Sequence, residues 1–175
     1  MTSRLGSLNE FCWMDLKTRD NVDRRAEAAT VNGARLVVPP FDAGDQGRVA
    51  ALIDPVGAAF SLWQPRRFTG WKVPRIAGAP QRMILACDQP DKARHFYGQT
   101  NGTPPTSADF IATRGPGPSA PQWELAVDVD DLDSVVTRAR DHGHGSVTWC
   151  EETDRRVVRL SSPEGLTFQV RRRGQ

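Results

Sequence analysis

Runs of alternating apolar and polar residues predict two similar strand pairs in this chain. Residues 47–65 (GRVAALIDPVGAAFSLWQP) match residues 155–173 (RRVVRLSSPEGLTFQVRRR) position by position, at a spacing of 108 residues. Each stretch is typical of a strand, a tight turn with the pattern Pro-x-Gly, and a second strand. Proline sets φ in such a turn, and glycine permits a positive φ. The sequence therefore predicts two β-hairpins in equivalent positions of the fold.

The residues before each hairpin repeat as well. Trp13 and Asp23 recur 110 residues later as Trp123 and Asp133. In both copies an apolar strand pattern is followed by a helical pattern and then by a further strand. Asp20 or Asn21 is expected to cap the first helix, which Gly33 should end. The predicted order in both copies is β-α-β-β-β. Before the first hairpin we expect a strand over 11–17, a helix over 22–32 and a strand over 34–40 that the double proline ends. Before the second hairpin we expect a strand over 122–131, a helix over 132–143 and a strand over 145–152.

The middle of the chain predicts a third module with fewer strands than the other two. Residues 65–81 are rich in proline and glycine and are typical of a linker, although Phe68 and Trp71 are expected to pack. A strand over 82–88, a helix over 90–100 that begins near Pro90, and a short strand at DFIAT (109–113) follow. We therefore expect an α+β fold of paired βαβββ modules with curved, cup-like sheets, some of them truncated. The expected domains are 1–74, a shortened N-terminal module, and 75–175, a reduced module followed by a complete one.

Composition narrows the classes of partner. The net charge of +2 is too small to favour nucleic acid, and the three consecutive arginines at 171–173 are typical of a solvated strand end. No apolar run approaches the length of about 20 residues that a membrane span needs. The first ten residues lack the apolar core of a signal peptide, and the three cysteines show no CxxC spacing. These features predict a cytoplasmic protein with reduced thiols, without nucleic-acid or membrane partners.

Three stretches resemble the vicinal oxygen chelate superfamily, which includes glyoxalase I, bleomycin-resistance proteins and extradiol dioxygenases. They are ELAVDVDDLDSVVTRARDHG, RMILACDQPDKARHFYGQTNG and the two closing hairpins, in that family's order and duplication. The pairing of FCWMDL with GDQGRVAALIDPVGAAFSLWQP is most similar to two-domain actinobacterial glyoxalase-like proteins. The chain departs from that pattern because FCWMDLKTRD passes straight into NVDRRAEAA, where the family has further elements. The resemblance implies a glyoxalase/bleomycin-resistance fold.

The resemblance also implies where a ligand site would lie. Metal-dependent members bind a divalent ion with His and Glu from the strands of two modules, so that the metal acts as a Lewis acid on substrate oxygens. The opening-strand positions fall on Met14, Arg82 and Glu124, and the closing-strand positions fall on Ser61 and Gln169. Only Glu124 is a good ligand for a hard cation. We therefore expect no metal and no other cofactor.

Each candidate residue also has a structural interpretation. Glu124 either faces a ligand cavity or simply faces solvent, and Arg82 either pairs with Glu124, holds an anionic ligand or forms a surface salt bridge. Ser61 and Gln169 either bind a ligand or are satisfied polar residues of the sheet. Trp63 shares a strand face with Ser61, so it either stacks on a planar ligand or packs in the core. The predicted ligand-binding set is therefore Met14, Ser61, Trp63, Arg82, Glu124 and Gln169.

Two functions remain open from the sequence. The first is a metal-independent protein that binds or sequesters a small molecule, such as an antibiotic or another secondary metabolite. The second is a metal-free isomerase, cyclase or lyase for a planar or hydrophobic metabolite, with Glu124 as general acid or base and Arg82 or Gln169 stabilising an oxyanion. A degenerate member with a structural role is a third interpretation. The shortened modules leave sheet surface to be covered, which predicts a homodimer.

Overall fold

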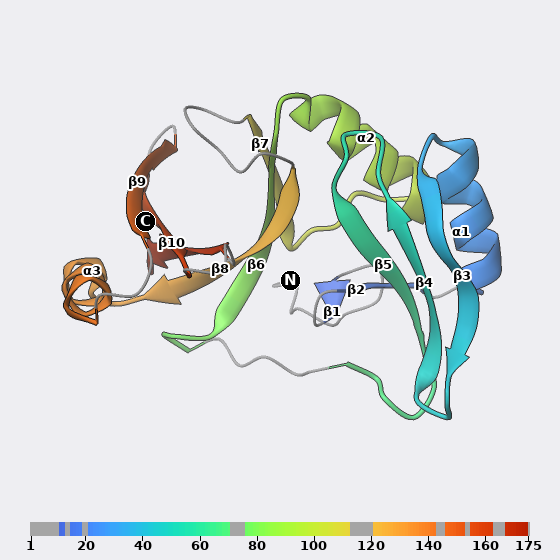
Figure 1. Ribbon diagram of the computed structural model, residues 1–175, viewed down its shortest axis with the longest axis horizontal. Helices are drawn as coiled ribbons and strands as arrows, with labels where there is room; N and C mark the ends of the chain where they lie inside the picture. The colour runs from blue at the N-terminus through green and yellow to red at the C-terminus, as the bar shows by residue number, and fades with distance from the viewer. Residues whose placement is uncertain are drawn as a thin grey trace. The chain divides into compact units, whose positions relative to one another are not determined.

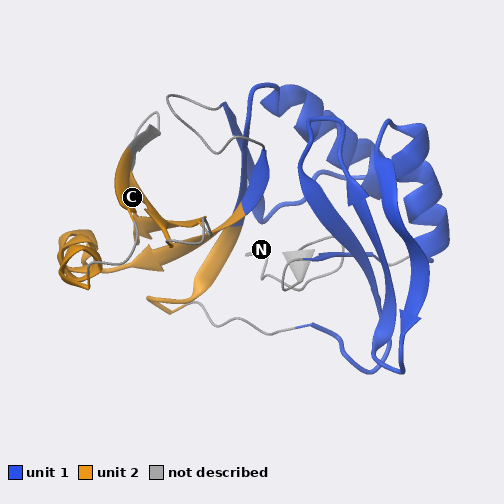
Figure 2. Cartoon of the chain, in the orientation of Figure 1, with its two compact units in different colours: residues 1–72, 83–123 blue, residues 73–82, 124–175 orange. Residues whose placement is uncertain are grey.

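The computed structural model describes residues 11–12, 15–18, 21–70, 76–112, 121–142, 146–152, 155–162 and 167–174. The chain divides into two compact units (Figure 2). Unit 1 comprises residues 1–72 and 83–123, and unit 2 comprises residues 73–82 and 124–175. The predicted domain boundary at residue 74 lies outside the described residues, so that division stays a prediction. The predicted α+β class is confirmed, with curved sheets and few helices (Figure 1).

Unit 1 contains a five-stranded sheet with the order β1-β2-β5-β4-β3. Strand β2 pairs in parallel with β5, whereas β5, β4 and β3 form antiparallel pairs. This is the predicted β-α-β-β-β order, with helix α1 connecting β2 to β3. Gly57 has a φ of 100° and donates its N–H to the Asp54 carbonyl, as the Pro-x-Gly turn requires. The bounds are β1 Phe11–Cys12, β2 Asp15–Lys17, α1 Val22–Val31, β3 Arg35–Ala43, β4 Gly47–Ile53 and β5 Ala59–Pro65.

Strand β3 is longer than the sequence predicts. The double proline does not end it, because pairing with β4 continues to Ala43 after register shifts around Val38. Strand β3 lies at the edge of the sheet, where a proline without an N–H costs no ladder hydrogen bond on the open side. The predicted end at residue 40 was wrong because an edge strand tolerates two prolines, whereas an inner strand would lose ladder hydrogen bonds at them.

The remaining strands form a six-stranded sheet with the order β7-β6-β8-β11-β10-β9, and the unit boundary falls within β6 and β8. Strands β8 and β11 pair in parallel, and β11, β10 and β9 form antiparallel pairs, which reproduces the pattern of unit 1. The predicted reduced set is confirmed as β6, α2 and β7. The bounds are β6 Pro80–Cys87, α2 Pro90–Asn101, β7 Ala108–Ala112, β8 Gln122–Val129, α3 Leu132–Asp141, β9 Ser146–Glu152, β10 Arg155–Ser161 and β11 Thr167–Arg172.

Local capping explains where the helices begin. The Asn21 side chain accepts the Asp23 N–H at the start of α1, and the Asp131 side chain accepts the Ser134 N–H at the start of α3. Pro90 occupies the first turn of α2, where its missing N–H would have no partner in any case. The predicted Asn21 cap and the predicted role of Pro90 are confirmed. The described residues contain no helix with the length and apolar character of a membrane span.

A buried polar chain ties the first hairpin of unit 1 to helix α2. The Tyr97 hydroxyl donates to Asp54 Oδ2 at 2.9 Å and accepts the Trp123 Nε1–H at 3.0 Å. The other carboxylate oxygen of Asp54 accepts the backbone N–H groups of Val56 and Ala58 in the hairpin turn. Tyr97 also packs against Phe60, Phe96, Phe110 and Trp123.

This polar chain gives unit 1 a defined dependence on pH. Burial is the main cause that raises the pKa of Asp54 above its ordinary value of 3.8, outweighing its hydrogen bonds. Because the folded-state pKa is raised, the protonated carboxyl contributes stability below pH 3.8, and that contribution is lost as the pH rises through the folded-state pKa. We therefore compare the free energy of unfolding of the wild type with that of Asp54→Asn. The wild-type value minus the variant value is expected to fall as the pH rises from 3.8 through the folded-state pKa of Asp54. Denaturant unfolding of both proteins between pH 3.5 and 7 measures the difference, and a flat difference would contradict it.

Candidate functional site

The sheet of unit 2 has one apolar face and one polar face. Helix α3 covers the apolar face through Leu132 and Val136, which pack against Val158 and Val170. Side chains alternate along each strand, so the neighbours of these valines point to the opposite face. The strand register aligns Arg159 with Gln169 and aligns Gln169 with Ala126, two residues beyond Glu124. The face without the helix therefore carries Glu124, Asp128, Arg159, Thr167, Gln169 and Arg171.

Glu124 is the centre of this polar face. Its side chain is only 1% exposed, yet it accepts hydrogen bonds from three neighbouring side chains. Arg159 Nε lies 3.0 Å from Oε1 and 3.1 Å from Oε2. Thr167 Oγ1 donates to Oε1 at 2.6 Å, and Gln169 Nε2 donates to Oε2 at 2.9 Å. Arg159 and these two neutral donors thus compensate the buried carboxylate, as a charge removed from water requires.

Gln169 has one polar atom that this network leaves open. Its Nε2 group is used by Glu124, but its buried Oε1 atom has no hydrogen-bond partner among the described residues. Burying an acceptor without a partner costs about 1–3 kcal/mol. An arriving hydroxyl or N–H group would remove that cost. The polar face therefore presents an acceptor that is held in position by the Glu124 network.

A second ion pair lies on the same face. Arg171 donates to Asp128 Oδ1 from Nε at 3.3 Å and from Nη2 at 3.1 Å, and its side chain is buried. The arginine run at 171–173 was predicted to be a solvated strand end. This is wrong for Arg171, because alternation along β11 turns it onto the same face as Gln169. Arg173 is exposed and pairs with Asp130.

The structure brings together two of the predicted site residues, Glu124 and Gln169. Arg82 lies on β6 and is half-buried, and its predicted pairing with Glu124 stays a prediction. Arg159 is a cation that contacts Glu124. Sequence reasoning missed Arg159, Thr167, Asp128 and Arg171. The alternating pattern of the closing hairpin could have placed Arg159 beside Gln169, but only with the register of β10 against β11 in hand.

The corresponding strands of unit 1 carry a smaller polar site. Asp15 of β2 aligns with Ser61 of β5, and these two side chains are hydrogen-bonded. Burial is the larger influence and raises the pKa of Asp15, while the Ser61 hydrogen bond opposes it. Met14, the predicted partner position, lies outside the described residues. Sequence reasoning missed Asp15.

Trp63 is tightly held within unit 1. The residue is 8% exposed, its Nε1–H donates to the Phe68 carbonyl at 3.2 Å, and its ring packs edge-on against Phe68. Gly47 lies directly against the indole, where a Cβ atom would come within 2.7 Å of both the ring and the Gln64 carbonyl. The expected packing of Phe68 is confirmed. A role for Trp63 in ligand stacking stays a prediction, and its contacts here are those of a core side chain.

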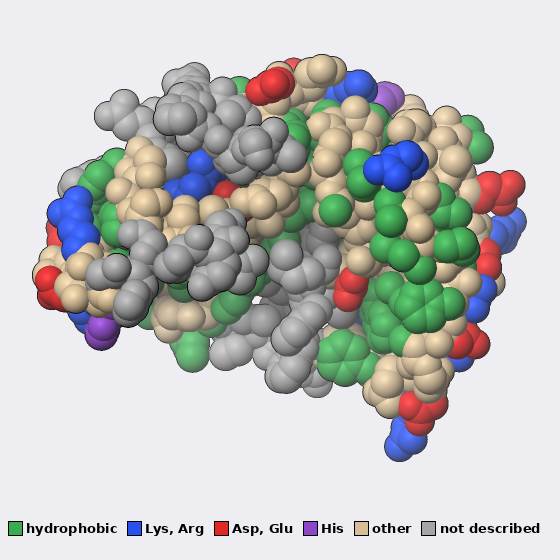
Figure 3. Space-filling model, in the orientation of Figure 1, with side chains coloured by type: hydrophobic (Ala, Val, Ile, Leu, Met, Phe, Trp, Pro, Cys, Tyr) green, Lys and Arg blue, Asp and Glu red, His purple; other side chains and the backbone are tan. Residues whose placement is uncertain are grey.

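The residues around Glu124 do not fit a divalent metal ion. Metal-dependent sites need several anionic or imidazole ligands that converge on one point. Here an arginine lies against the carboxylate, and the other donors are a hydroxyl and an amide N–H. Within the described part of the chain, no three His, Cys, Asp or Glu side chains group closely enough to hold a metal ion. In Figure 3, basic side chains with an acidic neighbour lie on the inner side of this curved sheet.

Comparison with known structures identifies the fold class. The chain superposes on the Mn(II)-bound glyoxalase from Novosphingobium aromaticivorans with a TM-score of 0.56 and 14% identity, over 88% of this chain and 59% of that one. It superposes on the 2,3-dioxygenase LapB from Pseudomonas sp. KL28 with a TM-score of 0.55 and 9% identity, over 92% of this chain and 70% of that one. The protein therefore has the glyoxalase/dioxygenase fold.

Sequence relatives place the chain more closely. It is 30% identical over 180 residues to CFP32 of Mycobacterium tuberculosis, named as a candidate glyoxylase, and the match covers 90% of this chain and 68% of the relative. It is 27% identical over 177 residues to DnrV of Streptomyces peucetius, named as an anthracycline biosynthesis protein, over 90% of this chain and 64% of that relative. The chain belongs to the glyoxalase-like family of the vicinal oxygen chelate superfamily. No protein-family model matches it.

Proposed function

We propose that this protein binds a small molecule without a metal ion on the polar face of β8, β10 and β11. The observation that most supports this proposal is that buried Gln169 Oε1 has no hydrogen-bond partner among the described residues. Glu124, which is paired with Arg159, accepts a hydrogen bond from the same amide and so holds it in position. A site that only stabilised the fold would gain nothing from a buried acceptor without a partner. The ligand that this supports presents a hydroxyl or N–H group to Gln169.

The ligand class follows from this chemistry and from the relatives. DnrV is named as an anthracycline biosynthesis protein. Anthracyclines are planar polycyclic compounds with phenolic hydroxyl groups, and a phenolic hydroxyl is a suitable donor for Gln169. We therefore favour a planar, phenolic secondary metabolite. Binding or sequestration of such a compound requires no reacting group in the protein.

The second candidate function is a metal-free enzyme with Glu124 as general acid or base. It is favoured by the deep burial of Glu124 beside an arginine, an environment often found in catalytic sites. Against it, three donors already contact the carboxylate oxygens, so a substrate would have to displace one of them before a proton could move. The geometry therefore supports binding better than turnover.

The test is titration with a fluorescent anthracycline. We expect wild-type protein to bind it with an affinity that chelation of divalent metals leaves unchanged. Gln169→Leu removes the open acceptor and should weaken binding by about tenfold, the equivalent of about 1.4 kcal/mol. Gln99→Leu is the matched control, because Gln99 is an exposed glutamine on α2 and should leave the affinity unchanged.

Three outcomes would change this assignment. Equal affinities of wild type and Gln169→Leu would remove the proposed contact, and loss of binding on chelation would remove the metal-free claim. A change in the mass of the recovered anthracycline would show turnover. In that case, retention of binding but loss of turnover in Glu124→Gln would assign the acid or base role to Glu124.

A further inference from the structure

Arg159 takes part in the Glu124 network through one nitrogen atom. Its Nε atom lies 3.0 Å from Glu124 Oε1 and 3.1 Å from Glu124 Oε2. Neither of its two terminal nitrogens, Nη1 and Nη2, forms a hydrogen bond with another described residue. A guanidinium group donates from all of its nitrogens and accepts from none. The polar face of unit 2 therefore carries N–H donors that the described fold does not use.

These donors belong to the side chain next to Gln169. Arg159 of β10 stands directly opposite Gln169 of β11 on the same face of the sheet, where paired side chains reach one another. Both side chains also donate to one carboxylate oxygen. Arg159 Nε lies 3.1 Å from Glu124 Oε2, and Gln169 Nε2 lies 2.9 Å from it. Glu124 therefore fixes the guanidinium group and the amide group side by side.

No hydrogen bond joins the unused atoms of these two described side chains. Gln169 Oε1 is buried and has no partner among the described residues, although a guanidinium group lies beside it. A single ligand group that satisfies both must donate to Gln169 Oε1 and accept an N–H from Arg159. A hydroxyl group does both. An amino group donates but accepts poorly when it is bound to an aromatic ring, and an ether oxygen accepts but cannot donate.

Arg159 also lies where a ligand can reach it. Its side chain is 14% exposed, whereas that of Glu124 is 1% exposed. A ligand group therefore approaches Gln169 from the side of Arg159. Because the guanidinium group is largely removed from water, water competes weakly for its N–H groups, and a hydrogen bond to them is stronger than at the surface.

We propose that Arg159 determines the specificity of this ligand face and selects a hydroxyl group over an amino or an ether group. The assignment rests on the proposed function and narrows its ligand class, because Gln169 Oε1 alone accepts from a hydroxyl and from an N–H group alike. The ligand hydroxyl donates its hydrogen to Gln169 Oε1, and its oxygen accepts an N–H from a terminal nitrogen of Arg159. Hydrogen bonds from a charged donor are stronger than neutral ones, so Arg159 discriminates between ligands of equal shape.

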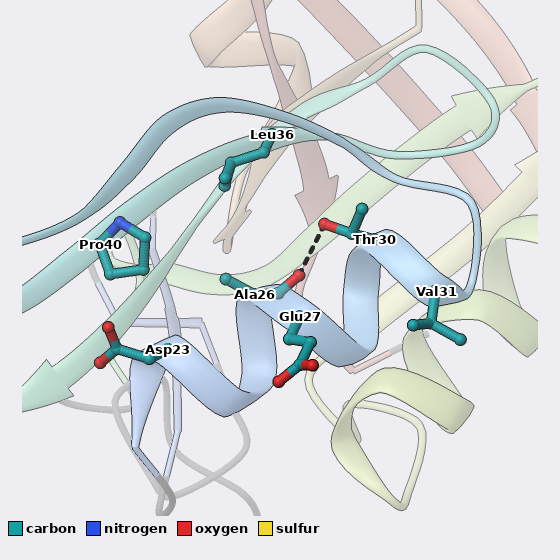
Figure 4. A pocket seen from close by; sticks show the side chains of 7 residues that line it. All are labelled: Asp23, Ala26, Glu27, Thr30, Val31, Leu36 and Pro40. Atoms are coloured by element: carbon teal, nitrogen blue, oxygen red, sulfur yellow. Dashed lines mark hydrogen bonds between the residues drawn. The ribbon is translucent and has the colours of Figure 1, made fainter.

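The groove of unit 1 between α1 and β3 offers no such pair of groups (Figure 4). It has a volume of about 340 Å³, and Leu36 borders it on the strand side. Among its polar groups, Thr30 Oγ1 donates to the Ala26 carbonyl at 2.8 Å, and Asp23 is engaged by Arg48 through two bonds of 2.8 Å. A planar compound held there would make mainly apolar contacts, so its affinity would not distinguish a hydroxyl from an amino group.

The test is titration with three fluorescent naphthalenes that differ in one substituent. The probes are 2-naphthol, 2-naphthylamine and 2-methoxynaphthalene. We expect the wild type to bind the naphthol about tenfold more tightly than either of the others, because only the hydroxyl makes both hydrogen bonds. This comparison uses the wild type alone, so it does not depend on the folding of any variant.

Two variants assign the two bonds separately. Arg159→Lys keeps a cation beside Glu124 and removes the terminal nitrogens, so it should weaken the naphthol and the methoxynaphthalene about tenfold and leave the naphthylamine unchanged. Gln169→Leu should weaken the naphthol and the naphthylamine and leave the methoxynaphthalene unchanged. Arg173→Lys is the matched control, because Arg173 is an exposed cation of the same unit that pairs with Asp130. Leu36→Asp alters the groove of unit 1, and all three affinities should survive both control substitutions.

Four outcomes would overturn the proposal. The first is equal affinity of the wild type for the naphthol and the naphthylamine, and the second is an Arg159→Lys protein that folds by circular dichroism and keeps the preference for the naphthol. The third is loss of naphthol binding in Leu36→Asp, which would move the probe to the groove. The fourth is binding of the anthracycline but of none of the naphthalenes, which would remove the role of Arg159 and leave the proposed function standing. Failure of the anthracycline itself to bind would remove both.

Discussion

Tyr97→Phe is expected to lower the free energy of unfolding by about 2–4 kcal/mol. The substitution keeps the aromatic ring and removes only the hydroxyl group. Asp54 Oδ2 then loses its 2.9 Å donor, and Trp123 Nε1 loses its 3.0 Å acceptor, both in a buried site. Each unsatisfied buried group costs about 1–3 kcal/mol, with bonds to a carboxylate at the upper end.

Chemical denaturation at neutral pH measures this effect. Phe110→Leu is a useful control, because it changes the packing against the Tyr97 and Trp123 rings without removing a polar atom of the chain. The double variant Asp54→Asn/Tyr97→Phe should be less destabilised than the sum of its single variants, since the two residues share one hydrogen bond. A loss below about 0.5 kcal/mol for Tyr97→Phe would show that water replaces the hydroxyl and that the polar chain does not stabilise unit 1.

Glu124→Gln is expected to lower the stability of unit 2 by about 2–4 kcal/mol and to weaken ligand binding. The carboxylate is 1% exposed and its partner Arg159 is 14% exposed, so the variant leaves a cation largely removed from water without its counter-charge. Removing one partner of a buried pair typically costs about 3–5 kcal/mol, and the part-exposure of Arg159 reduces that value. The variant side chain keeps one acceptor oxygen for the donors that now share two, so the hydrogen bond that holds the Gln169 amide in position weakens.

Hydrogen exchange of the β8 and β11 amides measures the effect within unit 2 by itself. Replacing both partners in Glu124→Gln/Arg159→Met should recover part of the lost protection, because no unpaired cation remains. Protection of unit 1 amides, such as those of β4, should stay as in the wild type. Equal protection of β8 and β11 in wild type and Glu124→Gln would mean that the ion pair contributes nothing to the fold.

The polar face of unit 2 is organised by an engaged carboxylate, and one acceptor next to it, Gln169 Oε1, has no hydrogen-bond partner among the described residues. This arrangement suits selective hydrogen bonding.

Much of the fold was predictable because its signals are local. Gly57 adopts the positive φ that the Pro-x-Gly pattern implies, and Asn21 caps α1 as expected. The duplication of the hairpin then implied equivalent sheets, which the parallel pairs β2–β5 and β8–β11 confirm. The end of β3 was not predictable from Pro39 and Pro40, because only the sheet order shows that β3 is an edge strand.

The candidate site was predictable only in part. Glu124 and Gln169 were named from a family resemblance, and the structure joins them at 2.9 Å. Arg159 and Thr167 were missed because their approach to Glu124 depends on the register of three strands. Similarly, Asp15 meets Ser61 through the parallel pairing of β2 and β5.

The sequence by itself determined the two βαβββ modules, their turns and caps, and the family, since these follow from short-range patterns and from duplication. Only the tertiary structure decided which charges meet. It paired Glu124 with Arg159, buried Arg171 against Asp128, and left Gln169 Oε1 without a hydrogen-bond partner among the described residues. The physical reason is that hydrogen bonds and ion pairs act over a few ångströms, and strand register, which sets those distances, is fixed by contacts between distant parts of the chain.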